Sequence, residues 1–459
     1  MSTTCEVPVP APTPATRPSI APPRPTRRLG LAVLALAFLP AALCFDIVMA
    51  RARGWQLESK VDTLVLMLSV IALAMLVVAT LVAPVRRRLA LAWRQCVLLG
   101  VVVILSWFLI EVALAVFLPN VTEVPFHHRW PNMSMVFHPR SDVMPGVSGA
   151  AHYTTNSLGI RGSELPSNRA VPRVLCLGGS TTECAYLDET ETWPSLLMQY
   201  LNETTAGTKD KCWVGNAGIS GFNSRHHLRF ARESELMDEI DCLVLLVGIN
   251  DFTKFVETEQ LTAEIEQEQA LALAKEPLWC RSQVRNLARR AANVYLPTMT
   301  RRYEDPDGAN YQLRRQERHS AKQDDKLPDL KGALAEYARR IEQIAKQCRE
   351  KHVRLIVVNQ PVLWRSDLDD KEDSLLWLGW TAHDSFLTAA ALRQGMDEHN
   401  ATLAATCKRL GIEMVDLSDM NGRQEFFYDD CHYSELGAVE VAHRLATWFA
   451  QHPLLAETR

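Results

Sequence analysis

Long apolar runs dominate the first quarter of the chain, which has 459 residues. The runs over 63–84 and 97–118 are each long enough to cross about 30 Å of hydrocarbon. The run over 29–50 is shorter and contains Pro40, so a signal peptide is the alternative to a membrane span. A signal peptide would leave the other two runs unexplained. We therefore predict three transmembrane helices at about 29–50, 63–84 and 97–118.

A different pattern begins at about residue 171, where short apolar runs alternate with helical stretches. The five short runs are 172–178, 211–218, 241–248, 353–360 and 412–418. Their apolar residues are nearly continuous, which is typical of strands in a parallel sheet that is covered on both faces. The clearest helix is expected over 332–351, because Leu334, Tyr337 and Ile341 recur at helical spacing. We therefore predict a three-layer α/β/α sandwich with a parallel sheet, of flavodoxin-like type, over 171–459.

Three segments break these patterns. Residues 1–28 are rich in proline, which lacks a backbone N–H, and we interpret them as a disordered tail. Residues 119–170 form a linker and lead-in between the apolar runs and the alternating pattern. Residues 253–329 interrupt the alternation and are strongly charged, which favours an inserted helical or partly disordered excursion. A lid over the site is the alternative interpretation of this insertion.

Charge limits the classes of partner and orients the apolar runs. The formal net charge is -4, so the chain has no basic footprint for nucleic acid. Arginines precede the first run and lie between the second and third, and such clusters face the cytoplasm. After the third run no lysine or arginine occurs before Arg129, which predicts that the C-terminal part faces away from the cytoplasm. The basic residues of the loop over 51–62 weaken this assignment without reversing it.

The cysteine spacing indicates no metal site. Eight of the eleven cysteines lie in the C-terminal part, where they form neither a CxxC pair nor a zinc pattern. Cys176 and Cys242 fall at strand positions, where small apolar residues are usually buried. The sequence therefore predicts neither a metal nor a cofactor.

Four short motifs could together supply the chemistry of ester cleavage, which needs a nucleophile, a base, a group that orients the base, and donors for the oxyanion. Ser180 follows the first predicted strand in "VLCLGGSTTEC". Gly221 of "NAGISG" and Asn250 of "VGIND" follow the next two strands and could donate hydrogen bonds. Asp429 precedes His432 by three residues in "FFYDDCHYSELG", a spacing that lets the carboxylate fix the imidazole tautomer. The alternative for each motif alone is ordinary turn and helix-cap chemistry.

Taken together and in this order, "GGST", "NAGISG", "GIND" and "DDCH" resemble the four blocks of the SGNH (GDSL-like) hydrolase family. The resemblance implies Ser180 as nucleophile, with Asp429 and His432 completing a catalytic triad. It also implies an oxyanion hole made by the backbone N–H of Ser180, by Gly221 and by Asn250. The family's usual Gly-Asp-Ser is Gly-Gly-Ser here, which puts the type of substrate in doubt.

A further segment, "TTNSLGIRGSE" over 154–164, resembles the Asn-x-x-Gly-x-Arg-Gly lead-in of bacterial membrane-anchored SGNH proteins, which are often associated with cell-surface or exported polysaccharides. The alternative is a surface turn with glycines at positive φ. Trp364, Trp377 and Trp380 follow the fourth predicted strand and could stack on sugar rings. Core packing or contact with a membrane surface would use these side chains equally well.

These features predict a membrane-anchored serine esterase of SGNH type that removes O-acyl groups from a carbohydrate or cell-surface polymer through an acyl-enzyme. The expected location is the bacterial inner membrane, with the catalytic part periplasmic and membrane partners of a polysaccharide export or modification system nearby. Three alternatives remain open: an O-acyltransferase that acts on polysaccharide, a lipase or lysophospholipase, and a non-catalytic polysaccharide-assembly protein.

Overall fold

The computed structural model describes residues 25–52, 60–117, 129, 131–204, 212–261, 282–288 and 305–454. The chain divides into two compact units. One unit comprises Met1–Leu118 with Pro277–Arg285, and the other comprises Pro119–Glu276 with Asn286–Arg459. Most of the predicted tail, the linker over 119–128 and much of the predicted insertion lie outside the described residues.

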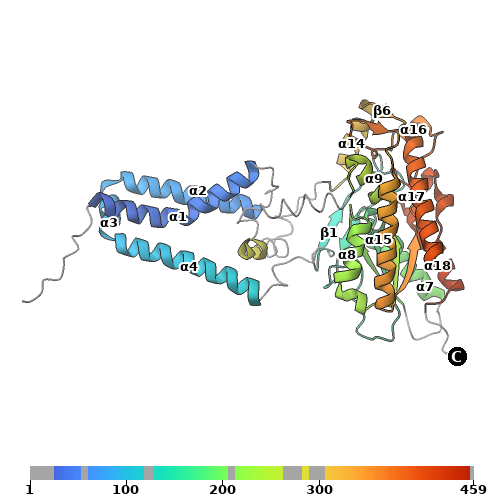
Figure 1. Ribbon diagram of the computed structural model, residues 1–459, viewed down its shortest axis with the longest axis horizontal. Coiled ribbons are helices and arrows are strands. Elements are labelled where there is room, and N and C mark those ends of the chain that lie inside the picture. Colours follow the sequence, from blue (N-terminus) through green and yellow to red (C-terminus); the bar gives the residue numbers. More distant parts are fainter. Residues whose placement is uncertain are drawn as a thin grey trace, which may run out of the picture. The chain divides into compact units, whose positions relative to one another are not determined.

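The first unit is helical (Figure 1). Its helices are α1 (Pro25–Ala52), α2 (Lys60–Leu81), α3 (Ala83–Leu91) and α4 (Trp93–Phe117). Three stretches are long and apolar enough to cross a membrane: Thr26–Met49, Asp62–Leu81 and Trp93–Phe117. Most of their large apolar side chains are exposed, which would be unfavourable in water. Helices α1 and α4 pack closely at Gly100, where an added Cβ would lie 2.7 Å from the Ala35 carbonyl oxygen.

A short polar segment binds to two acids of these helices. Ser282 Oγ and the Gln283 backbone N–H donate to the Glu111 carboxylate at 2.5 and 2.6 Å. The Arg285 guanidinium donates two hydrogen bonds to Asp62, at 2.6 and 3.0 Å, and both side chains are buried. Residues 283–288 form a short helix. This segment of the predicted insertion therefore gives both acids a partner. Such bonds stabilise the unit, because an unpaired carboxylate is unfavourable among apolar helices.

The second unit is built on a five-stranded parallel sheet in the order β4-β3-β5-β7-β9. The strands are β3 (Arg173–Gly178), β4 (Trp213–Gly218), β5 (Cys242–Leu246), β7 (Arg354–Val358) and β9 (Glu413–Val415). Each lies within one of the five predicted runs, and the order is the flavodoxin-like one. The predicted fold is therefore confirmed. Strand β3 has β4 on one side and β5 on the other, so its carboxyl end is the topological switch point where ligands bind in such folds.

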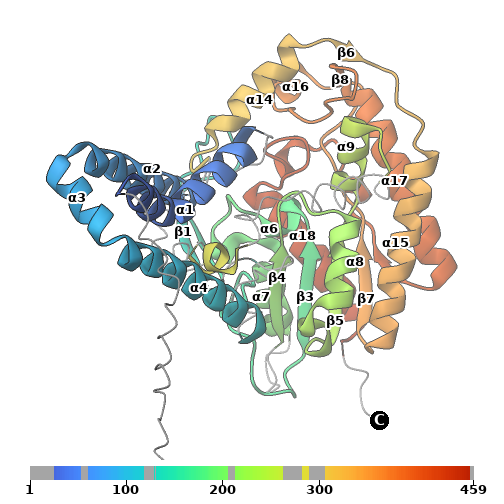
Figure 2. The same ribbon diagram turned by 60° about the vertical axis from the view of Figure 1, so that its left-hand side comes forward.

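Helices cover both faces of the sheet (Figures 1 and 2). In β3, Val174 and Cys176 pack into one core, and the alternate residues Leu175 and Leu177 pack into the other. The first core includes residues of α7 (Trp193–Thr204) and α18 (Glu435–Gln451). The second includes residues of α8 (Ser224–Glu233), α15 (Lys331–Glu350) and α17 (Ala389–Leu410). Helix α15 matches the helix expected over 332–351.

The lead-in extends one edge of the sheet. Strands β1 (Ser134–Phe137) and β2 (Ala151–Thr154) form an antiparallel hairpin. Beyond it, the backbone of Arg161 exchanges hydrogen bonds with that of Asn216 in the edge strand β4. The segment over 129–164 is therefore joined to the α/β core by main-chain hydrogen bonds.

The remaining elements are a helix from the predicted insertion, a pair of two-residue strands and several short helices. Helix α14 (Ala309–Ser320) comes from the predicted insertion and leads into β6 (Gln323–Asp324), which pairs with β8 (Phe386–Leu387). The short helices are α6 (Ser180–Glu183), α9 (Ile249–Thr258), α16 (Asp370–Asp373), η1 (Glu189–Glu191), η2 (Glu235–Asp238), η3 (Ser418–Met420) and η4 (Gln424–Phe426).

Candidate active site

Ser180 is the first residue of α6, directly after the turn that ends β3. Two glycines make this turn possible because neighbouring atoms leave no room for side chains. A Cβ on Gly178 would lie 2.2 Å from Thr182 Oγ1, and a Cβ on Gly179 would lie 2.4 Å from Asn250 Nδ2. The crowding at Gly179 gives a physical reason for Gly-Gly-Ser in this chain, since the amide of Asn250 occupies the space next to the glycine.

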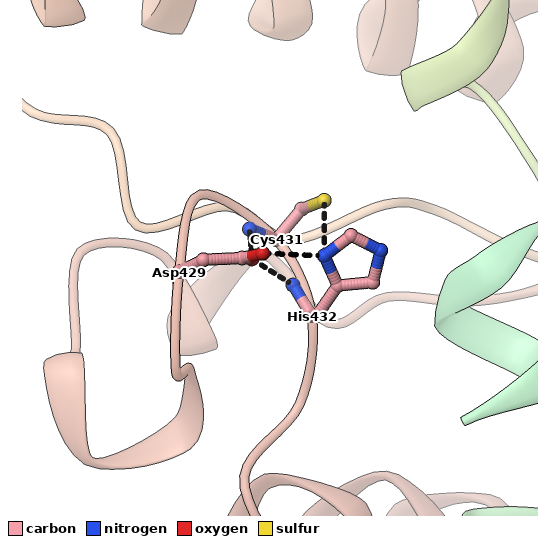
Figure 3. Close-up of side chains that lie close together, drawn as sticks. All are labelled: Asp429, Cys431 and His432. Atoms are coloured by element: carbon pink, nitrogen blue, oxygen red, sulfur yellow. Dashed lines mark hydrogen bonds and ion pairs between the residues drawn. The ribbon is translucent and has the colours of Figure 1, made fainter. Parts of the chain in front are cut away.

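Ser180, His432 and Asp429 form a continuous series of hydrogen bonds. Ser180 Oγ lies 2.7 Å from His432 Nε2, and His432 Nδ1 lies 2.7 Å from Asp429 Oδ2. The other carboxylate oxygen of Asp429 accepts the backbone N–H groups of Cys431 and His432, at 3.0 and 2.8 Å (Figure 3). These bonds orient the carboxylate so that it can accept a hydrogen bond from Nδ1–H. Nε2 is then unprotonated and can accept the proton of Ser180.

The buried pair of Asp429 and His432 favours a carboxylate next to a basic imidazole. Burial raises the pKa of Asp429, but the charge of His432 and hydrogen bonds from His432 and Trp377 outweigh it and hold the pKa below its usual value. Burial lowers the pKa of His432, but the charge and hydrogen bond of Asp429 outweigh it and raise the pKa above its usual value. Trp377 Nε1 donates to Asp429 Oδ2 at 2.9 Å, so the indole helps to hold the acid in place.

Asp430, the neighbouring acid, has a different set of partners. It accepts hydrogen bonds from Trp364 Nε1 at 2.7 Å and from the backbone N–H groups of Trp377 and Leu378 at 2.8 and 3.3 Å. Burial, and then the charge of Asp429, raise its pKa to about 6. Asp430 therefore supports the loop that carries Trp377, whereas Asp429 supports the imidazole.

Gly221 and Asn250, the predicted oxyanion donors, line one cleft of about 950 Å³. Gly221 has a φ of +80°, a conformation that favours glycine. The side-chain amide of Asn250 donates to the Phe222 carbonyl oxygen at 2.8 Å and is thereby fixed next to Gly179. The same cleft is lined by Trp377 and Trp380, and we call it the tryptophan cleft. Its volume is near the upper end of the range for pockets that hold small ligands.

The three tryptophans differ in what they can bind. Trp380 is 41% exposed in the tryptophan cleft, and its ring packs edge-on against Phe386. Trp377 lines the cleft while its indole N–H binds Asp429. Trp364 departs from the prediction of a substrate-binding residue. Its side chain is fully buried against Phe252 and is bound to Asp430, so it has no ring face open to a ligand.

Helix α14 contributes side chains to the site that were not predicted from the sequence. The Tyr311 ring lies 6.3 Å from that of His432 and 5.6 Å from that of Trp377. The exposed Arg314 guanidinium lies 4.7 Å above the Trp377 ring, in the tryptophan cleft. Part of the predicted insertion therefore forms a wall of the site. The polar sequence of α14 is that of a solvated helix, and only the tertiary structure shows what it covers.

The cluster of Asp429, Cys431 and His432 offers atoms of the types that bind metal ions. Both oxygens of Asp429 already accept hydrogen bonds, and the bond to Oδ2 involves His432 Nδ1. Cys431 Sγ lies 3.8 Å from the same nitrogen (Figure 3). A thiol must lose its proton to bind a metal, and burial raises the pKa of Cys431 well above its usual value. The donor set therefore fits a hydrogen-bonded acid and base better than a metal centre.

A Ser-His-Asp series at the carboxyl edge of a parallel α/β sheet is an arrangement found in hydrolases that cleave acyl bonds. The sequence model of the GDSL-like lipase/acylhydrolase family matches residues 176–439. The chain belongs to this family, and this membership supports an ester-hydrolysing enzyme.

Solved structures similar to this chain have low sequence identity. A protein from Desulfitobacterium hafniense described as lipolytic, of the G-D-S-L family, is 11% identical with a TM-score of 0.33, covering 60% of this chain and 98% of its own. LAE5, an α/β hydrolase from the metagenome of Lake Arreo, is 14% identical with a TM-score of 0.34, covering 62% and 98%. The acetylxylan esterase Axe2 from Geobacillus stearothermophilus is 13% identical with a TM-score of 0.33, covering 63% and 100%. No curated protein sequence matches the chain.

Proposed function

We propose that this protein is a membrane-anchored serine esterase that removes O-acyl groups, such as acetyl, from a carbohydrate or cell-surface polymer. The observation that carries the proposal is the series Ser180 Oγ to His432 Nε2 and His432 Nδ1 to Asp429, with both distances at 2.7 Å. Family membership independently supports cleavage of an ester.

The proposed reaction has two steps, acylation and deacylation of Ser180, and His432 acts as base and as acid in each. Nε2 of His432 takes the hydroxyl proton of Ser180 as Oγ attacks the ester carbonyl. The backbone N–H groups of Ser180 and Gly221 and the amide of Asn250 stabilise the oxyanion of the tetrahedral intermediate. His432 then returns the proton to the leaving hydroxyl, and an acyl ester remains on Ser180. Water, deprotonated by His432, releases the acid and restores the serine.

A polymeric, sugar-containing substrate is supported by the tryptophan cleft. The cleft reaches from Gly221 and Asn250 to the half-exposed ring of Trp380, and its volume exceeds what an acetyl group alone needs. Aromatic side chains with one apolar face and a polar edge suit surfaces that are partly wet, as sugar rings are. A catalytic unit outside the cytoplasm is supported by the arginines between the second and third apolar stretches, which favour a cytoplasmic loop there.

The test is hydrolysis of p-nitrophenyl acetate by the detergent-solubilised full-length protein. We expect Ser180→Ala and His432→Ala each to lower kcat about a thousandfold or more, as for other triads. Ser374→Ala and His443→Ala, which change exposed residues of the same types, are the matched controls and should keep full activity. Substantial activity in Ser180→Ala would overturn the proposal.

Acetylated xylan and a longer-chain ester, assayed beside the small substrate, address the acyl group and the acceptor. Preferential release of acetate from xylan supports a carbohydrate esterase, whereas preference for the long chain would favour a lipase. Uptake of an acyl label on Ser180 without release to water, followed by transfer to an added sugar, would make the protein an O-acyltransferase.

A further inference from the structure

Glu183 is a buried acid on the same short helix as Ser180. It is the last residue of α6, three positions after the serine, and only 2% of it is exposed. Its Oε1 accepts hydrogen bonds from the Arg129 guanidinium and from Tyr153 Oη, the latter at 2.9 Å. Its Oε2 accepts the backbone N–H of Ser220 at 2.8 Å and the hydroxyl of the same residue. A buried carboxylate is tolerated when it is paired and hydrogen-bonded in this way.

The charge of Glu183 is retained in spite of its burial. Burial raises the pKa of this carboxyl, but the charge of Arg129 and hydrogen bonds from Ser220 and Tyr153 outweigh it and hold the pKa below its usual value. Glu183 is therefore ionised near neutral pH, and its bonds to Ser220 are charge-assisted, which makes them stronger than neutral hydrogen bonds.

Through Ser220, Glu183 joins the two halves of the predicted oxyanion hole. Ser220 directly precedes Gly221, whose backbone N–H is one expected donor, and α6 begins with Ser180, which supplies another. The two segments also touch at the main chain, because a Cβ on Gly218 would lie 2.2 Å from the Glu183 nitrogen. Asn216 adds a third connection, donating to the Thr182 carbonyl oxygen at 2.8 Å.

The lead-in supplies the groups that hold Glu183. Arg129 and Tyr153 both belong to it, and Arg161 of the Asn-x-x-Gly-x-Arg-Gly motif donates to the carbonyl oxygens of Glu183 and Cys184, at 2.6 and 2.7 Å. The Arg161 guanidinium also packs 4.6 Å from the centre of the Tyr153 ring. The Asn-x-x-Gly-x-Arg-Gly motif of the lead-in therefore binds the C-terminal end of α6, the helix that begins with Ser180.

We propose that Glu183 is a positioning residue for the proposed esterase reaction, whose ionised carboxylate fixes the loop that carries Gly221 against the helix that carries Ser180. Arg129 and Tyr153 hold this carboxylate in place and in its charged form. Because the oxyanion exists only after Ser180 attacks, loosening Gly221 weakens contacts made in the transition state and leaves substrate binding nearly unchanged. The inference rests on the function proposed above.

The test compares kcat and KM for p-nitrophenyl acetate in full-length variants. Glu183→Gln preserves shape and removes the charge, and we expect kcat to fall about 10- to 100-fold with KM changed less than about threefold. Ser220→Ala keeps the backbone N–H and removes only the hydroxyl, so its loss of kcat should be smaller. Glu189→Gln is the matched control, since Glu189 also binds the lead-in, through Thr154, and has no bond to Ser220. It should keep kcat within about threefold of the wild-type value.

A double variant separates positioning from folding. Glu183→Gln leaves the Arg129 charge without its acid, which by itself could destabilise the protein. Glu183→Gln with Arg129→Gln removes both charges, so thermal stability should recover while kcat stays low. Recovery of kcat together with stability would overturn the inference, as would an unchanged kcat in Glu183→Gln. Ser180→Ala, assayed in parallel, reports on the proposed function separately: if it stays active, that function fails, whatever Glu183 does.

Discussion

Two additions to the α/β core, the lead-in and α14, each bind their neighbours through a buried arginine, and we call them the lead-in side and the α14 side of the site. Arg161 of the lead-in donates to four main-chain carbonyl oxygens, those of His152, Glu183, Cys184 and Leu187. Arg315 of α14 donates to three, those of Val143, Leu375 and Tyr428. Both guanidinium groups are buried, and each offers several donors to carbonyl groups of separate segments of the chain.

The two sides differ in how they compensate the buried charge. On the lead-in side, Glu189 lies 3.8 Å from Arg161 and Glu183 binds Arg129, so acids stand next to the arginines. On the α14 side, no ion pair to Arg315 or Arg318 occurs within the described ranges, and the acids whose charges reach Arg318 are Asp430 and Asp373. The lead-in side therefore carries its charges in local pairs, whereas the α14 side relies on carbonyl dipoles and on two acids that form no ion pair with its buried arginines.

The largest effect that tests this comparison is the loss of either buried arginine. Arg161→Met and Arg315→Met leave four and three main-chain carbonyl groups without these donors, and we expect each to lower the free energy of unfolding by roughly 3 to 5 kcal/mol. Thermal unfolding of the full-length protein in detergent measures this as a fall in Tm. Arg423→Met, at a half-exposed ion pair with Glu425, should change stability by less than about 1 kcal/mol. Equal effects of Arg161→Met and Arg423→Met would remove the scaffolding role.

The second effect is the pH dependence of stability that Asp430 adds on the α14 side. The pKa of Asp430 is about 6 in the folded protein, against an ordinary value of 3.8, so the folded state binds more protons between these values. Stability from this group therefore falls as pH rises from about 4 to 6 and stays at the lower level above that. The difference amounts to roughly 2 to 3 kcal/mol.

Asp430→Asn should remove this fall, and the comparison of Tm against pH for both proteins measures it. Any cost of placing an amide there is independent of pH. Asp419→Asn, at an exposed acid bound to Arg444, is the control and should leave the fall in place. A wild-type Tm that rises steadily from pH 4 to 6 by as much as that of Asp430→Asn would contradict the assignment.

The third effect is a loss of activity in Gly179→Ala, which changes the turn directly before Ser180. The added Cβ would lie 2.4 Å from Asn250 Nδ2, so the amide must move away from its place beside the turn. We expect kcat for p-nitrophenyl acetate to fall about 10- to 100-fold, in line with the loss of one oxyanion donor. Gly411→Ala adds a methyl group at a helix end with nothing within 4 Å, and it should affect stability alone. Full activity in Gly179→Ala would separate Asn250 from the reaction.

The smallest effect concerns Arg314 on the α14 side. Its positive charge lowers the pKa of His432, against the larger upward effect of Asp429. In Arg314→Gln the pKa of His432 should therefore rise. Because the imidazole must be neutral to accept a proton, the acid limb of kcat/KM moves to higher pH, and the move is small because Arg314 is exposed to solvent. Arg229→Gln, which changes an exposed arginine of α8, should leave the profile unchanged. A shift to lower pH would show that Arg314 acts in another way.

The parts of the molecule that could be predicted from sequence are those whose signal is local. Continuous apolar runs predict both the membrane-length helices and the five strands. A segment that is apolar on all sides can be recognised from its own residues, without knowledge of its partners in the fold. Ser180, Gly221, Asn250, Asp429 and His432 each follow a strand or lie in a short motif, and the topology of a parallel sheet brings such ends together.

The parts that could not be predicted depend on distant partners. Glu183 has three partners, separated from it by 54, 30 and 37 positions, and no local pattern marks them. Tyr311 belongs to a polar helix that packs over the site because Arg315 and Arg318 find carbonyl groups elsewhere. Trp364 was predicted to bind sugar because the sequence does not show the hydrogen-bond partner of its indole, Asp430, which lies 66 positions further along the chain.

The segment over 282–288 changes how the catalytic unit would be released by a protease. The chain passes between the two units three times, after residues 118, 276 and 285. A single cut between 118 and 129 breaks only the first connection, and Asp62 and Glu111 keep their bonds to Arg285, Ser282 and Gln283. Release would then require either dissociation of these buried polar bonds or two further cuts, one at each of the connections after residues 276 and 285. Nicking of the first linker alone would therefore leave the second unit attached to the unit that carries the apolar helices.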